Sequence, residues 1–155
     1  MSDHAQALTY YRKVEAVQPD NLNIALQIGQ CLTRLENYAE ALSYFYKVEY
    51  LEKNPNNARR AIAWCSFLTG KYEESLKYYR QLTSESSAKA EDWMNTGHVY
   101  FAMRNIREAV QSYLKAQEYE KNHTNFLNVF NKDKEALLSR GLSEEDIRIV
   151  LDLLV

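Results

Sequence analysis

The side chains best suited to acid–base or metal chemistry are few and scattered along this sequence. The histidines are His4, His98 and His123, and none has a nucleophile or a carboxylate at a spacing typical of a catalytic site. The sequence also lacks a phosphate-binding loop, an HExxH zinc motif and a CxxC redox motif. We therefore predict that the chain is not an enzyme and that it binds no metal and no cofactor.

The two cysteines do not indicate a redox or metal site. Cys31 and Cys65 are 34 residues apart, and further ligands do not stand near them in the sequence. We interpret both as small, buried hydrophobic residues. Acidic pairs, such as Glu73 with Glu74, stand where helices are expected to begin. Since a carboxylate there favours the helix dipole, they need no catalytic explanation.

Composition and charge exclude several classes of function. The 155 residues suggest one domain, and the low content of Gly (4) and Pro (2) favours long helices with short connections. A formal net charge of -2 argues against a nucleic-acid surface, which needs clustered Lys and Arg. No segment reaches the ~18 apolar residues of a membrane span, and the first residues do not resemble a signal peptide. We expect neither nucleic-acid binding nor membrane insertion, and we expect a cytoplasmic location.

The elements that would position any functional side chain are predicted by an internal repeat of 34 residues. Small residues recur at this step at Ala7, Ala41, Ser75 and Ala109. Four positions further on, the same step gives aromatic residues at Tyr11, Phe45, Tyr79 and Tyr113. Upstream, small residues recur at Gly29, Ala63 and Gly97. This agreement predicts a repeated pair of helices, in which small residues let the backbones approach and large rings fill the space beside them.

The pattern resembles the tetratricopeptide repeat, which has a period of about 34 residues and a Trp, Leu-Gly, Tyr, Ala, Phe and Pro signature. The third full unit matches best, with Trp93, Thr96, Gly97, Tyr100, Ala109 and Tyr113. In the first two full units, Ala25 and Arg59 replace the Trp. The closing Pro19 of an N-terminal half unit has a shifted counterpart in Pro55, and neither the second nor the third full unit has a closing Pro. The resemblance covers roughly residues 3–121.

This resemblance implies an all-α fold, a right-handed superhelical solenoid of helix hairpins with C-terminal capping helices. We expect a single domain over residues 1–155, divided into a half repeat (3–19), three repeats (22–55, 56–89 and 90–123) and capping helices (124–155). Helices are expected at 3–18, 21–35, 38–53, 56–69, 72–83, 88–103, 106–121, 124–140 and 143–154. The first of these is the second helix of a hairpin without its partner. We therefore expect a fragment of a larger protein, with an N-terminal cap as the alternative.

Beyond residue 121 the repeat is lost, and the C-terminal helices carry other signals. Gly141 is well placed to end a helix in the left-handed conformation. Ser143 with Asp146 resembles a helix-capping arrangement. We interpret the two last helices as a cap over the final repeat. The alternative is a docking or dimer helix, which would give a homodimer through the exposed end helices.

The resemblance also implies where a ligand would bind, because such arrays usually bind extended or helical peptide segments on a concave face formed by the first helix of each hairpin. The periodicity places these residues in the groove: Asn23, Leu26, Gln27, Gln30, Thr33, Arg60, Trp64, Phe67, Met94, Asn95, His98 and Phe101. Trp64 is the candidate anchor, since it is an additional large aromatic outside the structural Trp position. The alternative is that Trp64 packs between helices.

Some members of the family grip a carboxylate at the end of a peptide with a set of Lys, Arg and Asn residues. Here Leu26, Gln30 and Ala61 stand at the matching positions, and Asn95 alone conforms. We therefore predict a protein–protein interaction scaffold that binds a peptide or protein segment in the groove, but not a receptor of that kind. The alternative is a structural module for self-association or for linking domains, with no separate ligand.

Overall fold

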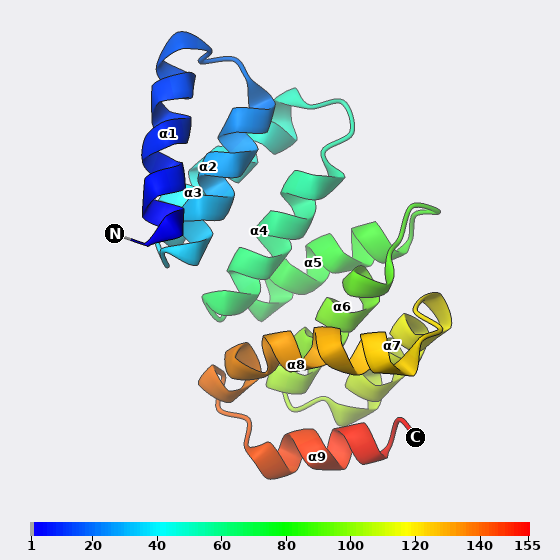
Figure 1. Ribbon diagram of the computed structural model, residues 1–155. Helices are drawn as coiled ribbons and strands as arrows, with labels where there is room; N and C mark the ends of the chain where they lie inside the picture. Colours follow the sequence, from blue (N-terminus) through cyan, green and yellow to red (C-terminus); the bar gives the residue numbers. More distant parts are fainter. Residues whose placement is uncertain (1) are drawn as a thin grey trace. The chain divides into compact units, whose positions relative to one another are not determined.

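A computed structural model describes residues 2–155, and within them the chain forms nine α-helices and no strand (Figure 1). The helices are α1 (Asp3–Val17), α2 (Leu22–Arg34), α3 (Tyr38–Leu51), α4 (Asn56–Leu68), α5 (Tyr72–Thr83), α6 (Ala90–Ala102), α7 (Ile106–Tyr119), α8 (His123–Ser139) and α9 (Glu144–Asp152). Every boundary lies within about two residues of the predicted one. The prediction of an all-α chain of short-linked helices is confirmed.

The chain divides into two compact units, Met1–Cys65 and Ser66–Val155. The boundary falls inside α4, so most of that helix belongs to the first unit and its last turn to the second. The first unit also holds α1, α2 and α3, and the second holds α5 to α9. The division into one domain with repeats at the stated boundaries stays a prediction.

Each unit contains a hairpin in which a glycine faces an aromatic ring. In the first unit α2 packs on α3, and a Cβ at Gly29 would overlap the ring of Phe45. In the second unit α6 packs on α7, and a Cβ at Gly97 would lie 2.5 Å from Cε1 of Tyr113. Because neither ring leaves room for a side chain on the facing helix, glycine allows the close helix approach that the repeat predicted.

Left-handed residues reverse the chain at the helix turns. The turn after the first helix of each hairpin contains one, at Glu36 (φ 60°), Gly70 (φ 77°) and Arg104 (φ 63°). Gly141 ends α8 with φ 86°, as predicted, and glycine adopts this conformation without a steric penalty. Ser143 then caps α9, because its Oγ accepts the N–H of Asp146 while the Asp146 carboxylate accepts the N–H of Ser143. The predicted capping arrangement is confirmed.

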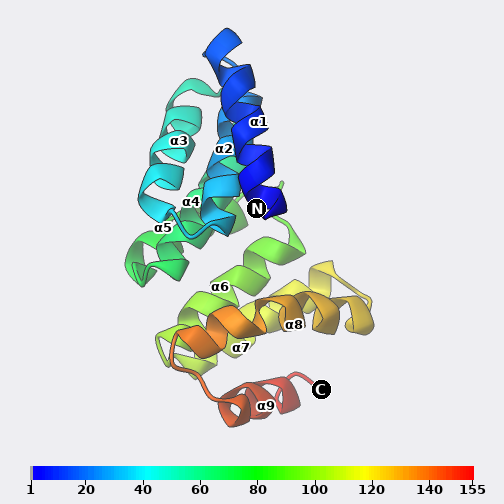
Figure 2. The same ribbon diagram turned by 60° about the vertical axis from the view of Figure 1, so that its left-hand side comes forward.

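In the second unit, α8 lies against both α6 and α7, and α9 runs back antiparallel to α8 (Figures 1 and 2). The buried residues on α8 are Phe126, Phe130 and Leu137, and those on α9 are Ile147 and Val150. Phe130 of α8 packs against His98 and Tyr113, so α8 covers part of the last hairpin, as predicted for a C-terminal capping helix.

Candidate binding surface

The face of α2 that was predicted to line a groove is open in the first unit. Asn23 and Gln30 are exposed, while Leu26 and Gln27 are half-buried. Leu26 packs against the buried cluster of Ala25, Val48 and Ala58. These side chains stand three or four positions apart, so they form one continuous stripe along the helix.

Thr33, at the end of the same stripe, makes contacts within the unit. Its Oγ1 donates to the carbonyl of Gly29 at 2.9 Å and lies 3.3 Å from Sγ of Cys65 on α4. Burial raises the pKa of the Cys65 thiol, which keeps it protonated. Cys31 and Cys65 are both buried free thiols, which agrees with their interpretation as small hydrophobic residues. The Thr33 contact joins α2 to α4.

The predicted residues of α4 differ in exposure. Arg60 and Trp64 are half-buried, and Arg60 Nη1 lies 3.5 Å from Oδ1 of Asn57. Phe67 is fully buried in the second unit, where its ring packs beside Tyr72 and below the guanidinium of Arg140. Of these three residues, Arg60 and Trp64 retain surface that a ligand can reach.

On α6 the four predicted groove residues are buried. Met94 is 3% exposed, Asn95 8%, and both His98 and Phe101 0%. α8 covers His98 on this face: the ring of Phe130 lies 5.2 Å from that of His98, and Asp133 Oδ2 lies 3.3 Å from His98 Nε2. α5 also packs on α6. All four side chains are therefore buried within the unit, with His98 under the capping helix, and they do not line an open groove.

His98 is at the centre of a buried polar chain. Its Nδ1 lies 2.8 Å from the hydroxyl of Tyr113, and Asp133 holds its Nε2. Burial raises the pKa of the Tyr113 phenol well above its ordinary value, so the hydroxyl stays protonated. An imidazole that carries its single proton on Nε2 accepts this O–H at Nδ1. Nε2–H then donates to the Asp133 carboxylate.

This Tyr–His–Asp order resembles a catalytic relay, in which a base activates a hydroxyl. Tyr113 is 0% exposed, however, so no substrate reaches its hydroxyl. The chain of hydrogen bonds instead joins α6, α7 and α8, and it satisfies a histidine that would otherwise be costly to bury. Sequence reasoning placed His98 in a groove and missed Asp133. The signal was the spacing of Phe126, Phe130 and Asp133 along one face of α8.

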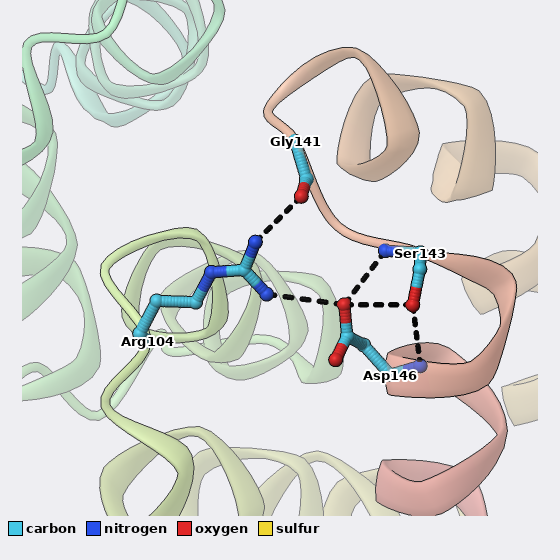
Figure 3. Close-up of polar contacts among 4 residues, drawn as sticks. All are labelled: Arg104, Gly141, Ser143 and Asp146. Atoms are coloured by element: carbon cyan, nitrogen blue, oxygen red, sulfur yellow. Dashed lines mark hydrogen bonds and ion pairs between the residues drawn. The ribbon is translucent and has the colours of Figure 1, made fainter.

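Two arginines hold the capping helices in place. Arg140 Nη1 donates to the carbonyls of Phe67 and Leu68 at the C-terminal end of α4, where a cation favours the helix dipole. Figure 3 shows the second contact, in which Arg104 donates to the carbonyl of Gly141 at 2.5 Å and pairs with Asp146 at 3.1 Å. Neither arginine was singled out in the sequence, because their partners are 37 to 73 residues away.

The same Asp146 carboxylate accepts hydrogen bonds from the backbone N–H and the hydroxyl of Ser143 (Figure 3). These bonds, together with the Arg104 contact, lower the pKa of Asp146 below its ordinary value. The side chains of this cluster are exposed, and they hydrogen-bond to one another. It anchors α9 to the turn between α6 and α7, and we interpret it as structural.

A depression in the first unit, between α1 and α3, is lined by polar side chains. The Tyr44 hydroxyl donates to Glu15 at 3.0 Å, and Arg12 pairs with Glu40 at 2.8 Å. Lys47 donates to the carbonyl of Pro19 at 3.1 Å. Because these groups bind one another, the depression joins α1 to α3 and offers no preformed ligand site.

Residues 2–155 contain no cluster of three or more His, Cys, Asp or Glu side chains that could hold a metal ion. Among the helices of this described part, none combines the length and apolar character that a membrane crossing needs.

Comparison with known proteins identifies the repeat. One tetratricopeptide-repeat family model matches residues 1–58, and a second matches residues 91–123. No curated protein matches the chain. The two matched segments cover the open stripe on α2 and the buried face of α6. The chain belongs to the tetratricopeptide-repeat family, and its fold is an all-α helical repeat.

Solved structures agree on the fold. MamA 41-end from Desulfovibrio magneticus RS-1 has a TM-score of 0.70 at 19% identity, over 98% of this chain and 86% of that one. A tetratricopeptide repeat protein from Parabacteroides merdae ATCC 43184 has a TM-score of 0.70 at 23% identity, over 98% and 64%. Another crystal structure of MamA gives 0.69 at 18% identity, over 98% and 87%. At these identities the likeness concerns the fold alone.

Proposed function

We propose that this chain is a protein–protein interaction scaffold that binds an extended segment of a partner protein along α2 of the first unit. Membership of the tetratricopeptide-repeat family supports a scaffold in general. The observation that supports this particular surface is a difference at one repeat position. Gln30 and His98 stand two repeat steps apart, yet Gln30 is exposed and His98 is buried under α8.

The chemistry of the α2 stripe suits a peptide backbone. Asn23, Gln27 and Gln30 carry amides, each of which donates and accepts hydrogen bonds, as a peptide group does. Leu26 offers an apolar contact between the amides. An extended segment has unsatisfied N–H and C=O groups along its length, and the amides of the stripe can bind them in sequence.

The same unit holds two further candidate contacts on α4. Trp64 offers a large ring as an anchor for an apolar side chain. Arg60 offers a guanidinium, which prefers a carboxylate. We therefore expect a partner segment with an apolar residue and an acidic residue. Replacing Arg60 by Glu should weaken the binding of such a segment, and unchanged binding would remove Arg60 from the proposed site.

Binding to a displayed peptide library, followed by fluorescence anisotropy with a selected peptide, tests the proposal. The double variant Gln27→Ala with Gln30→Ala should weaken binding roughly tenfold or more, because it removes two amides worth about 1 kcal/mol each. The matched control replaces Gln81 and Gln111, which are exposed on α5 and α7. Equal loss in both double variants, or no loss in either, would contradict the α2 surface.

A further inference from the structure

The hairpin of α6 and α7 binds α8 as a groove binds an amphipathic helix. Phe130 packs edge-on against Tyr113 at 5.4 Å, and Asp133 pairs with His98 at 3.3 Å. Ten residues after Phe130, Arg140 donates to carbonyls of α4. Phe126, Phe130, Asp133 and Leu137 are three or four positions apart, so they share one face. The second unit thus has a surface that recognises a helix of defined chemistry.

The connection that leads into α8 is short, with only residues 120–122 between the end of α7 and the start of α8. Residues 120–122 contain neither Gly nor Pro, and none of them has a positive φ. Glu120 has φ -105° and ψ 93°, and Asn122 has φ -87° and ψ 105°. An α-helix needs φ near -63° and ψ near -42°, so it is chiefly ψ that would have to change at these two residues. No residue of the connection therefore has to leave a positive-φ conformation to become helical.

This connection, like that between α5 and α6, lacks a proline. Pro19 stands 12 residues after Ala7, and the residue 12 positions after Ala109 is Lys121. A proline interrupts a helix and holds the preceding residue in an extended conformation. Pro19 and Pro55 provide this stop in two other connections between hairpins. Lys121 does not, and Glu120 and Lys121 are good helix formers.

We propose that α7 and α8 can join into one continuous helix, and that the α8–α9 segment of one copy then binds the α6–α7 hairpin of a second copy. In this exchanged dimer each copy supplies Phe130 and Asp133 to His98 of the other. It likewise supplies Asp146 to the other copy's Arg104. The contacts are those of the single chain, so exchange requires no new docking surface. The surface is the face of α6 and α7, and its partner is a second copy of this chain.

Two charge variants test whether the segment is exchanged. Arg104→Glu places a carboxylate opposite Asp146, and Asp146→Lys places an ammonium opposite Arg104, so each variant alone has a like-charged pair. In an exchanged heterodimer of the two variants, both positions have opposite charges. After co-refolding at high protein concentration, we expect a heterodimer fraction roughly threefold above the dimer fraction of either variant alone. No excess of heterodimer would overturn the proposal.

Two linker variants test the hinge by size-exclusion chromatography with light scattering, after refolding of the full chain at high and low protein concentration. Asn122→Ala removes the cap that Asn122 gives to Asn125 N–H and favours a continuous helix. Asn122→Ala should raise the association constant of the dimer roughly tenfold or more. Lys121→Pro should leave only monomer, because it holds Glu120 in the extended conformation that it already has.

The outcomes separate cleanly. Wild-type dimer that increases with Asn122→Ala and disappears with Lys121→Pro supports the proposal. A wild-type chain that stays monomeric after refolding at high concentration overturns it, as does a dimer unaffected by Lys121→Pro. Circular dichroism shows whether Lys121→Pro folds. If it does not fold, the Asn122→Ala variant is sufficient by itself, because an unchanged dimer fraction in that variant overturns the proposal.

Discussion

The inner helices α2 and α6 occupy the same place in their hairpins, yet their faces have different environments. Along α2 the stripe from Asn23 to Gln30 has exposed and half-buried side chains, whereas on α6 the stripe from Met94 to Phe101 is buried and its His98 lies under α8. Both helices keep the glycine that faces an aromatic ring. The comparison teaches that the repeat specifies how the two helices of a hairpin pack on each other. It does not specify whether the outward face of the first helix is exposed or buried.

The comparison is tested most severely at its paired positions, by His98→Ala and Gln30→Ala. Removal of the His98 ring leaves a cavity and takes away the partners of Tyr113 and Asp133, so we expect a loss of about 3 kcal/mol in the free energy of unfolding. Gln30→Ala should change it by less than about 0.5 kcal/mol, because the side chain is exposed. Urea denaturation followed by circular dichroism measures both. Similar losses would remove the distinction between the two faces.

The glycine positions test what the two hairpins share. Gly97→Ala should lower the free energy of unfolding by about 2 kcal/mol, since the ring of Tyr113 is fixed by His98 and Phe130 and cannot move away from the new Cβ. Gly29→Ala should cost about 1 kcal/mol, because Phe45 has no polar group to hold it and the helix gains from alanine. Thermal and urea unfolding of both variants show which substitution causes the larger loss of stability. A smaller loss at Gly97 than at Gly29 would contradict this account of Tyr113.

The anchoring of α8 can be weakened at its end by Arg140→Ala. The variant loses the donors to the Phe67 and Leu68 carbonyls and the packing over the Phe67 ring, so we expect a loss of about 1 to 2 kcal/mol. Arg148→Ala is the control, because Arg148 pairs with Glu145 on the surface of α9, where ion pairs contribute little. Hydrogen exchange of α8 amides should rise in Arg140→Ala alone. Equal exchange in both variants would mean that the contact does not hold α8.

The smallest effect concerns the anchor of α9 and its dependence on pH. The pKa of Asp146 is lower in the folded chain than its ordinary value of 3.8. Its carboxylate therefore stabilises the fold above that value, and the contribution is lost as the pH falls through the lower, folded pKa. Asp146→Asn should remove this part of the acid dependence, and Arg104→Ala should reduce it in part. Thermal melts across acidic pH measure the effect, and identical profiles for Asp146→Asn and wild type would contradict it.

Much of the architecture could be predicted because its signals are local or periodic. The 34-residue step located α1 to α7 to within about two residues, and Gly141 and Ser143 predicted the end of α8 and the cap of α9. The binding surface was harder to predict. Periodicity gave the inner faces of α2, α4 and α6 one common role, although burial depends on what each face meets in the folded chain.

By itself, the sequence determined the hairpins of this protein, because a small residue on one helix and a large ring on the next leave one close packing. It determined the family for the same reason. Only the tertiary structure decided which inner face stays open. His98 meets Asp133 across 35 residues of sequence, and that contact belongs to a capping helix outside the repeat. Burial of a face follows from which segment packs against it, and no periodic pattern within α6 carries that information.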